Sequence, residues 1–97
     1  MSFLDRVDAD RRLIMLQVME QDAGHSNEKN LQTALLSMGE VKGVVPGYVR
    51  RQMEFLETAR CVTLENFRDQ MLVCALTPTG RAVLRGSMSI DGISRPE

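Results

Sequence analysis

The residue types that most often do chemistry are few in this sequence, and they stand apart from one another. The 97 residues include one histidine, His25, and two cysteines, Cys61 and Cys74. A structural zinc site needs four Cys or His ligands at paired spacings, and general acid–base catalysis needs a partner held beside the histidine. No serine or glycine-rich stretch matches a nucleophile or phosphate-binding motif. We therefore expect no metal, no cofactor and no enzymatic activity, with His25 a surface or capping residue and both thiols buried and reduced.

Two adjacent arginines, Arg50 and Arg51, are the best candidates for binding a ligand. They lie in a predicted helix, 46–58, and its opposite face carries three apolar residues at helical spacing: Val49, Met53 and Leu56. Guanidinium groups on the outer face of such a helix can bind a DNA phosphate or the edge of a guanine. The alternative is a pair of solvated side chains, one of them joined to Glu54 or Glu57 at helical spacing.

Three further residues could contact DNA beside these arginines. Lys42 lies in the turn before the predicted helix 46–58, where it could neutralise a phosphate. Arg68 lies at the tip of a predicted hairpin, from which it could reach the minor groove or the DNA backbone. The hydroxyl of Tyr48 could reach a phosphate, although an aromatic residue on the flank of a helix is more often half-buried packing.

The overall charge does not favour nucleic acid. With 12 Lys and Arg against 13 Asp and Glu, the chain has a formal net charge of −1, whereas nucleic-acid-binding domains are usually basic. The acidic excess lies in residues 1–22, where three Arg stand against five Asp or Glu. In residues 46–60 three Arg stand against two Glu, so the helix that would contact DNA is mildly basic.

Size and hydropathy predict one soluble globular domain. A chain of 97 residues with 43% apolar and 26% charged residues has the composition of a single small domain. No apolar run approaches the roughly 20 residues that cross a bilayer. The first residues lack the basic start and apolar stretch of a signal peptide. We therefore expect a cytoplasmic protein with no membrane partner.

Periodicity and capping residues predict four helices. The first covers 9–21, and three apolar residues before it could extend it: Phe3, Leu4 and Val7. The second starts with Ser26 as its N-cap and ends at Gly39. Pro46 takes the first position of the third helix. Thr77 and Pro78 form a further cap and start, and this short helix runs through Leu84.

Between the third and the last helix the apolar period changes from helical to alternating. Residues 61–65 and 71–76 predict two strands of a β-hairpin whose turn centres near Asp69. In that register two cross-strand pairs face inward, Leu64 with Cys74 and Val62 with Leu76. The two cysteines are then not cross-strand partners, so we expect no disulfide.

This order of elements predicts an α+β, mainly α, winged helix-turn-helix fold. It comprises three helices, a two-stranded β-hairpin wing and a short C-terminal helix. We expect one winged-helix domain, 1–86, followed by a tail, 87–97. The tail is either a loose arm or an apolar strip that docks on another surface.

Several stretches resemble known winged-helix proteins. Leu76-Thr77-Pro78-Thr79-Gly80-Arg81-Ala82-Val83-Leu84 looks like the join between the last wing strand and the final helix in many winged-helix regulators. Three stretches resemble the small winged-helix proteins of Mu-like phages and prophages: Met1-Ser2-Phe3-Leu4-Asp5 with Asp10-Arg11-Arg12-Leu13, Tyr48-Val49-Arg50 with Leu56-Glu57, and Asp91-Gly92-Ile93-Ser94-Arg95-Pro96. Members are often described as transcriptional regulators by fold, without an assigned biochemical role. The resemblance implies a winged helix and a phage context.

Two functions of different classes are compatible with these features. The first is a homodimeric regulator that binds double-stranded DNA, with no small-molecule effector evident. Its dimer seam would use three residues of the first helix, which could equally be core filler: Met15, Leu16 and Met19. The second is a protein-interaction module of a phage, which binds a partner through the hairpin or the tail.

Overall fold

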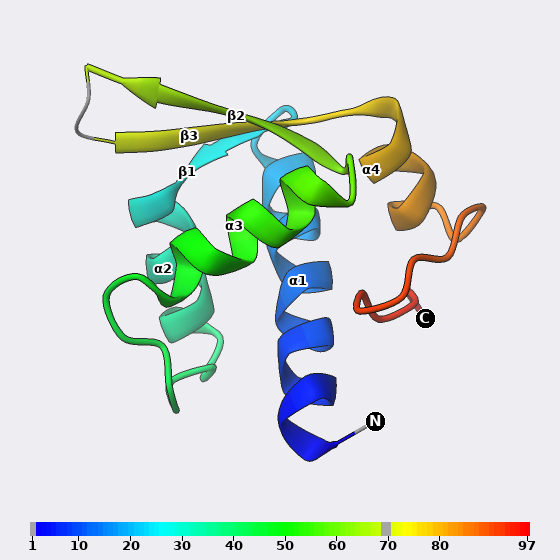
Figure 1. Ribbon diagram of the computed structural model, residues 1–97, viewed down its shortest axis with the longest axis horizontal. Helices are drawn as coiled ribbons and strands as arrows, with labels where there is room; N and C mark the ends of the chain where they lie inside the picture. The colour runs from blue at the N-terminus through cyan, green and yellow to red at the C-terminus, as the bar shows by residue number, and fades with distance from the viewer. Residues whose placement is uncertain (1, 69–70) are drawn as a thin grey trace.

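A long first helix, a three-stranded sheet and three shorter helices make up the computed structural model (Figure 1). It describes residues 2–68 and 71–97. In chain order the elements are α1 (Phe3–Gln21), β1 (His25–Asn27), α2 (Glu28–Ser37), α3 (Tyr48–Thr58), β2 (Val62–Phe67), β3 (Met71–Leu76) and α4 (Pro78–Leu84). The predicted class, α+β with helices in the majority, is confirmed. None of the helices described has a stretch long and apolar enough to cross a membrane.

The antiparallel sheet has the order β1-β3-β2. Across β2 and β3, two pairs lie opposite each other as predicted from the alternation of apolar residues, Leu64 with Cys74 and Val62 with Leu76. The predicted centre of the turn, Asp69, lies outside the described residues. The prediction of only two strands is wrong, because β1 pairs with the other side of β3. Its three residues, His25–Asn27, are polar and too few to show alternation.

The helix ends follow local capping, with two corrections. Ser26, predicted as the N-cap of α2, lies in β1, and Asn27 caps the helix instead by accepting a hydrogen bond from the Asn30 N–H at 2.8 Å. Pro46 lies outside α3, because Gly47 before the helix has a φ of +90°, which L side chains rarely adopt. At α4 the predicted cap is confirmed, with Thr77 as N-cap and proline at the first position.

The core fills the space between α1, the sheet and the two helices α2 and α3. The side chains expected at a dimer seam, Met15, Leu16 and Met19, are 0% exposed and pack within this core. That expectation is corrected, since a second chain cannot contact these side chains in this structure. The first helix is apolar around much of its circumference because several elements of its own chain cover it.

The tail after α4 packs back on the same chain. Arg12 donates a hydrogen bond to the Gly92 carbonyl at 2.8 Å, and the Ser94 N–H donates to the Ala9 carbonyl at 3.2 Å. Ile93 is buried, and a Cβ placed on Gly92 would lie 2.6 Å from the Phe55 ring. Residues 90–95 therefore cover one side of α1, whereas residues 3–6 in its first turns are all exposed.

Candidate functional site

Arg50 is already joined to a carboxylate of its own chain. Its Nη2 and Nε donate to the two oxygens of Glu28, at 2.8 and 3.1 Å. These hydrogen bonds hold the pKa of Glu28 below its usual range and raise the pKa of Arg50. A phosphate would have to displace Glu28 from the guanidinium, or bind beside an ion pair whose charges cancel. The pairing partner lies 22 residues away on α2, not on α3 as the sequence alternative had it.

Tyr48 is placed where it cannot reach a phosphate. The residue is only 7% exposed, and its hydroxyl donates a short hydrogen bond to Asp8 on α1. Burial is the main reason that the pKa of Tyr48 is raised, and the hydrogen bond to Asp8 acts in the same direction. The expected phosphate contact is therefore corrected: the side chain joins α3 to α1.

The other three expected DNA contacts are exposed. Arg51, Lys42 and Arg68 form no salt bridge within residues 2–68 and 71–97. Arg51 lies near the start of α3, 6.0 Å from the centre of the Tyr48 ring, and Lys42 lies in the segment between α2 and α3. Arg68 stacks over Phe67 at 5.1 Å, at the far end of β2. These cations can meet a phosphate or a carboxylate.

Acidic residues face the same region. The groove between α3 and β2 is lined by Arg50 and by three glutamates, which are Glu54, Glu57 and Glu65. Its apolar floor includes Leu64 and Leu72. Because Arg50 is paired with Glu28, this groove carries uncompensated negative charge among the residues described. A DNA backbone along the whole of α3 would approach these carboxylates.

The N-terminal end of the molecule carries a different kind of surface. We define the α1 notch as the pocket between the first turns of α1 and the segment before α3. Its lining residues are Phe3, Leu4, Val7, Asp8, Arg11, Glu40, Lys42, Gly43 and Tyr48. The walls are the exposed residues of α1 and of the 40–43 segment, and the base is the more buried Arg11 and Tyr48. The notch is thus apolar on its α1 side and polar at its base.

The base of the notch is held by a network around Arg11. This guanidinium is 5% exposed, forms a salt bridge with Glu40 at 3.0 Å and donates to the Lys42 carbonyl at 2.9 Å. Its Cζ also lies 5.3 Å from the centre of the Tyr48 ring. The network fixes the segment between α2 and α3 to α1, so the two walls of the notch are held relative to each other.

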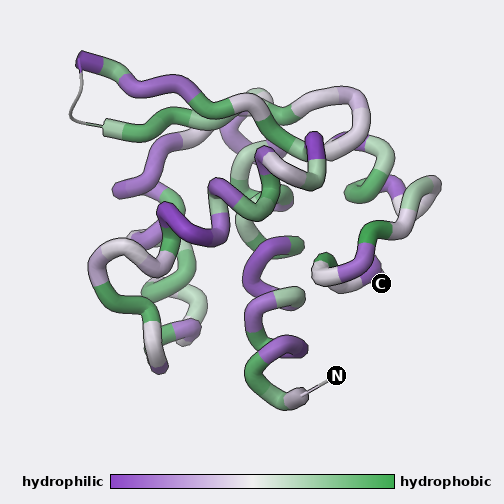
Figure 2. The backbone as a smooth tube through the Cα atoms, in the orientation of Figure 1, coloured by the Kyte–Doolittle hydropathy of each residue, from purple (hydrophilic) through white to green (hydrophobic). Residues whose placement is uncertain are grey.

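Large apolar side chains remain uncovered at this end. Phe3 is 79% exposed and Leu4 is 72% exposed. In the segment between α2 and α3, the side chains of Met38, Val41 and Val45 are each more than half exposed. Figure 2 shows hydrophobic stretches both at the N-terminal end of α1 and on the segment between α2 and α3. A group of exposed apolar residues of this kind marks a binding surface more often than isolated ones do. In the sequence the only signal was the spacing of Phe3, Leu4 and Val7, which predicted no more than an extension of the first helix.

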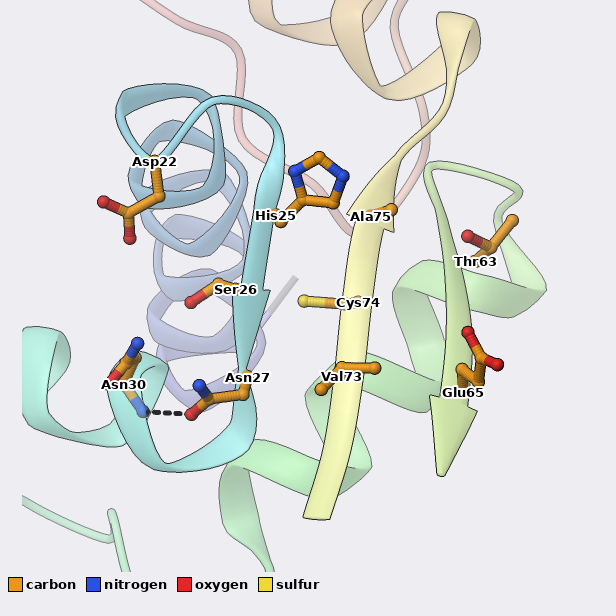
Figure 3. Close-up of a pocket in the computed structure, with 10 residues that line it drawn as sticks. All are labelled: Asp22, His25, Ser26, Asn27, Asn30, Thr63, Glu65, Val73, Cys74 and Ala75. Carbon is orange, nitrogen blue, oxygen red and sulfur yellow. Dashed lines mark hydrogen bonds between the residues drawn. The ribbon is translucent and has the colours of Figure 1, made fainter. Parts of the chain in front are cut away.

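The outer face of the sheet forms a shallower pocket (Figure 3). Its two cross-strand rows are His25–Ala75–Thr63 and Asn27–Val73–Glu65. His25 is exposed there, as expected for a surface histidine. Within the described part of the chain, no group of three His, Cys, Asp or Glu side chains could hold a metal ion.

Comparisons with known proteins do not identify a family. No protein-family model, no curated protein sequence and no solved structure matches this chain. The resemblance to small winged-helix proteins of Mu-like phages therefore stays a prediction from the stretches quoted above.

Proposed function

We propose that this chain is a non-enzymatic protein-interaction module with a winged-helix-like arrangement, and that it binds its partner through the α1 notch. The observation that carries the proposal is the exposure of Phe3 and Leu4 on a fixed helix beside a preformed notch. Removing one such side chain from water contributes about 1.5–3 kcal/mol, so two of them provide a strong drive for docking.

Several features support the winged-helix-like arrangement. α2 and α3 are joined by a turn, and the hairpin of β2 and β3 follows α3 directly. β1, beside α2, adds a third strand to the hairpin. The resemblance to Mu-like phage proteins fits this arrangement and favours a role in phage development. In this proposal the winged-helix-like arrangement places the α1 notch, with its apolar α1 wall, where a partner protein can dock.

The geometry favours protein over DNA as the partner. Of the five residues proposed for DNA, Tyr48 is buried and Arg50 is compensated by Glu28. The groove beside α3 also carries three glutamates. Phe3 and Leu4 in the wall of the notch offer nothing to a phosphodiester backbone, whereas the apolar face of a partner's amphipathic helix would pack against them.

DNA binding is the second candidate, and a specific observation keeps it open. The exposed cations Arg51, Lys42 and Arg68 lie on the elements that a winged helix would direct to DNA. Three phosphate contacts predict a shallow dependence of log K on log salt, with a slope of about −3. Fluorescence anisotropy with duplex DNA over a salt series tests this, comparing wild type with Arg51→Ala. An unchanged affinity in the variant would exclude the mode of binding described here.

Site-specific photo-crosslinking tests the protein-interaction proposal. A photoreactive phenylalanine analogue at position 4 should capture a partner in cells, and the same analogue at position 85, on exposed Arg85 beyond α4, is the matched control. The captured protein is then purified and titrated against wild type and Leu4→Asp. We expect the variant to raise the Kd by about tenfold or more. An equal Kd for wild type and variant would refute docking at the notch.

A further inference from the structure

We propose that the open edge of β2 accepts an extended, basic segment of a partner protein as an added strand, in the groove between β2 and α3. This groove is separate from the α1 notch, because the two pockets share no lining residue. The two surfaces therefore act independently, and the edge of β2 is an addition to the proposed function.

β2 pairs with another strand on one side only, because it is an outer strand in the sheet order β1-β3-β2. Leu76 lies opposite Val62, and its N–H donates to the Gly24 carbonyl, on the side of β3 away from β2. Val62 and Leu76 are thus a pair without hydrogen bonds to each other. Since hydrogen-bonded and non-hydrogen-bonded pairs alternate in an antiparallel ladder, the backbone groups of Leu64 and Asn66 also point away from β3.

The outward backbone groups of Leu64 and Asn66 are available to an added strand. In the described part of the chain, no backbone hydrogen bond outside the β2–β3 ladder involves either residue. Asn66 is exposed and Leu64 is half-buried, and both line the groove. A strand edge with free N–H and C=O groups is a template for an extended peptide, which gains affinity from main-chain hydrogen bonds.

The helix α3 forms the second wall of the groove. Arg50, Glu54 and Glu57 lie at i, i+4 and i+7, so they share the face of α3 that borders the groove. In Figure 1, α3 and β2 are joined at residues 59–61 and separate as β2 runs to its C-terminal end. The groove therefore follows the free edge of the strand.

The carboxylates around this edge favour a positively charged segment. Glu54, Glu57 and Glu65 are exposed and form no salt bridge with any described residue. Arg50, the cation among the lining residues, is already paired with Glu28. Lysine or arginine side chains of an incoming strand would neutralise these glutamates, whereas a nucleic-acid backbone would be repelled.

Both faces of an added strand would meet carboxylates, because its side chains alternate between the two faces of the sheet. Leu64 lies opposite Cys74 in the inner row, so an inward side chain beside it lies toward the glutamates of α3. Glu65 lies opposite Val73 in the outer row, so an outward side chain lies beside Glu65. A segment with basic residues on both faces fits this edge. The β2 strand of a second copy would instead bring a further Glu65 to the same carboxylates.

Fluorescence anisotropy with a labelled peptide tests this docking. The peptide repeats Lys-Lys-Val, which places lysine on both faces of an extended strand. We expect saturable binding with a Kd on the order of 100 µM, and no binding of a Glu-Glu-Val repeat of equal length. The Lys-Lys-Val peptide with methylated backbone nitrogens keeps its charge but has no N–H donors, so it should bind at least about tenfold more weakly.

Two charge-reversal variants locate the site. Glu57→Lys changes the groove, and Glu20→Lys, at an exposed position of α1, changes the net charge of the chain equally. We expect Glu57→Lys to raise the Kd at least about threefold and Glu20→Lys to have a smaller effect. Amide hydrogen exchange followed by NMR reports on the edge itself. With saturating peptide, the N–H groups of Leu64 and Asn66 should exchange at least about fivefold more slowly.

Each of these measurements has a result that would overturn the proposal. Absence of peptide binding refutes docking, and equal binding of the methylated peptide shows charge attraction without strand addition. Equal effects of Glu57→Lys and Glu20→Lys place the peptide elsewhere. Unchanged exchange at Leu64 and Asn66 in the complex excludes the edge. Protection of these two groups that rises with chain concentration in the absence of peptide assigns the edge to a second copy.

Discussion

Arg50 on α3 and Glu28 on α2 are joined by two hydrogen bonds of 2.8 and 3.1 Å, which tie the N-terminal ends of two helices together. Because Glu28 neutralises Arg50, the first candidate for a DNA contact is not a free cation. It also gives α3 a fixed position relative to α2. A cation that would otherwise mark a nucleic-acid surface thus acts within the fold.

The Glu28–Arg50 pair should contribute to stability in a pH-dependent way. The pKa of Glu28 is lowered by its hydrogen bonds to Arg50, so the contribution is present above the unfolded pKa and is lost as the pH falls through the folded one. Urea unfolding of wild type and Glu28→Gln between about pH 2 and pH 7 measures it. We expect a small stability difference at neutral pH that vanishes in acid. A difference that grows on acidification would contradict this assignment.

The salt bridge beneath the notch should respond differently to removal of each partner. Glu40→Gln leaves the buried Arg11 guanidinium without its counter-ion, and we expect a loss of about 1–3 kcal/mol, since Glu40 itself is partly exposed. Arg11→Met removes the buried charge and keeps much of the volume, so its loss should be smaller. Glu57→Gln, on the exposed face of α3, is the control in urea unfolding. A larger loss in Arg11→Met would show that the hydrogen bond to Lys42 dominates.

The thiol of Cys74 should be unreactive in the folded chain. Burial raises its pKa to about 11, and the residue is cross-strand to Ser26 in the inner row of the sheet. Because the folded pKa lies above the unfolded one, this group stabilises the fold fully below about pH 9 and loses that contribution as the pH rises toward 11. A thiol reagent at pH 8 should label Cys74 at the rate of unfolding. Labelling at the rate of a free thiol in native protein would disprove the burial.

Local chemistry accounts for the parts of the structure that the sequence predicted correctly. The hairpin register follows from alternation, because a slip by one residue would expose Val62 and bury Thr63. The start of α4 follows from Thr77 and Pro78, whose side chains act on the adjacent turn. Both signals need only neighbouring residues.

The parts that the sequence missed depend on distant contacts. β1 is a strand because β3, more than forty residues later, provides its hydrogen-bonding partner. Tyr48 is buried, and its hydroxyl donates a hydrogen bond to Asp8 on α1; periodicity within α3 gives no sign of either. The exposure of Phe3 and Leu4 in the first turn of α1 could not be predicted either, since an apolar face looks the same in sequence whether its own chain covers it or not.

Substitutions of Ser26 and Asn27, the two residues before α2, should change the free energy of unfolding differently. The sequence predicted Ser26 as the N-cap, whereas the structure predicts the larger loss at Asn27. The Ser26 hydroxyl is buried and has no hydrogen-bond partner in the described part of the chain, so Ser26→Ala removes a polar group that is costly to bury. We expect it to be neutral or to stabilise the fold by about 1 kcal/mol. Asn27→Ala removes the cap of α2 and should destabilise by about 1 kcal/mol. Thermal and urea unfolding of both variants measures this, and a larger loss for Ser26→Ala would return the capping role to Ser26.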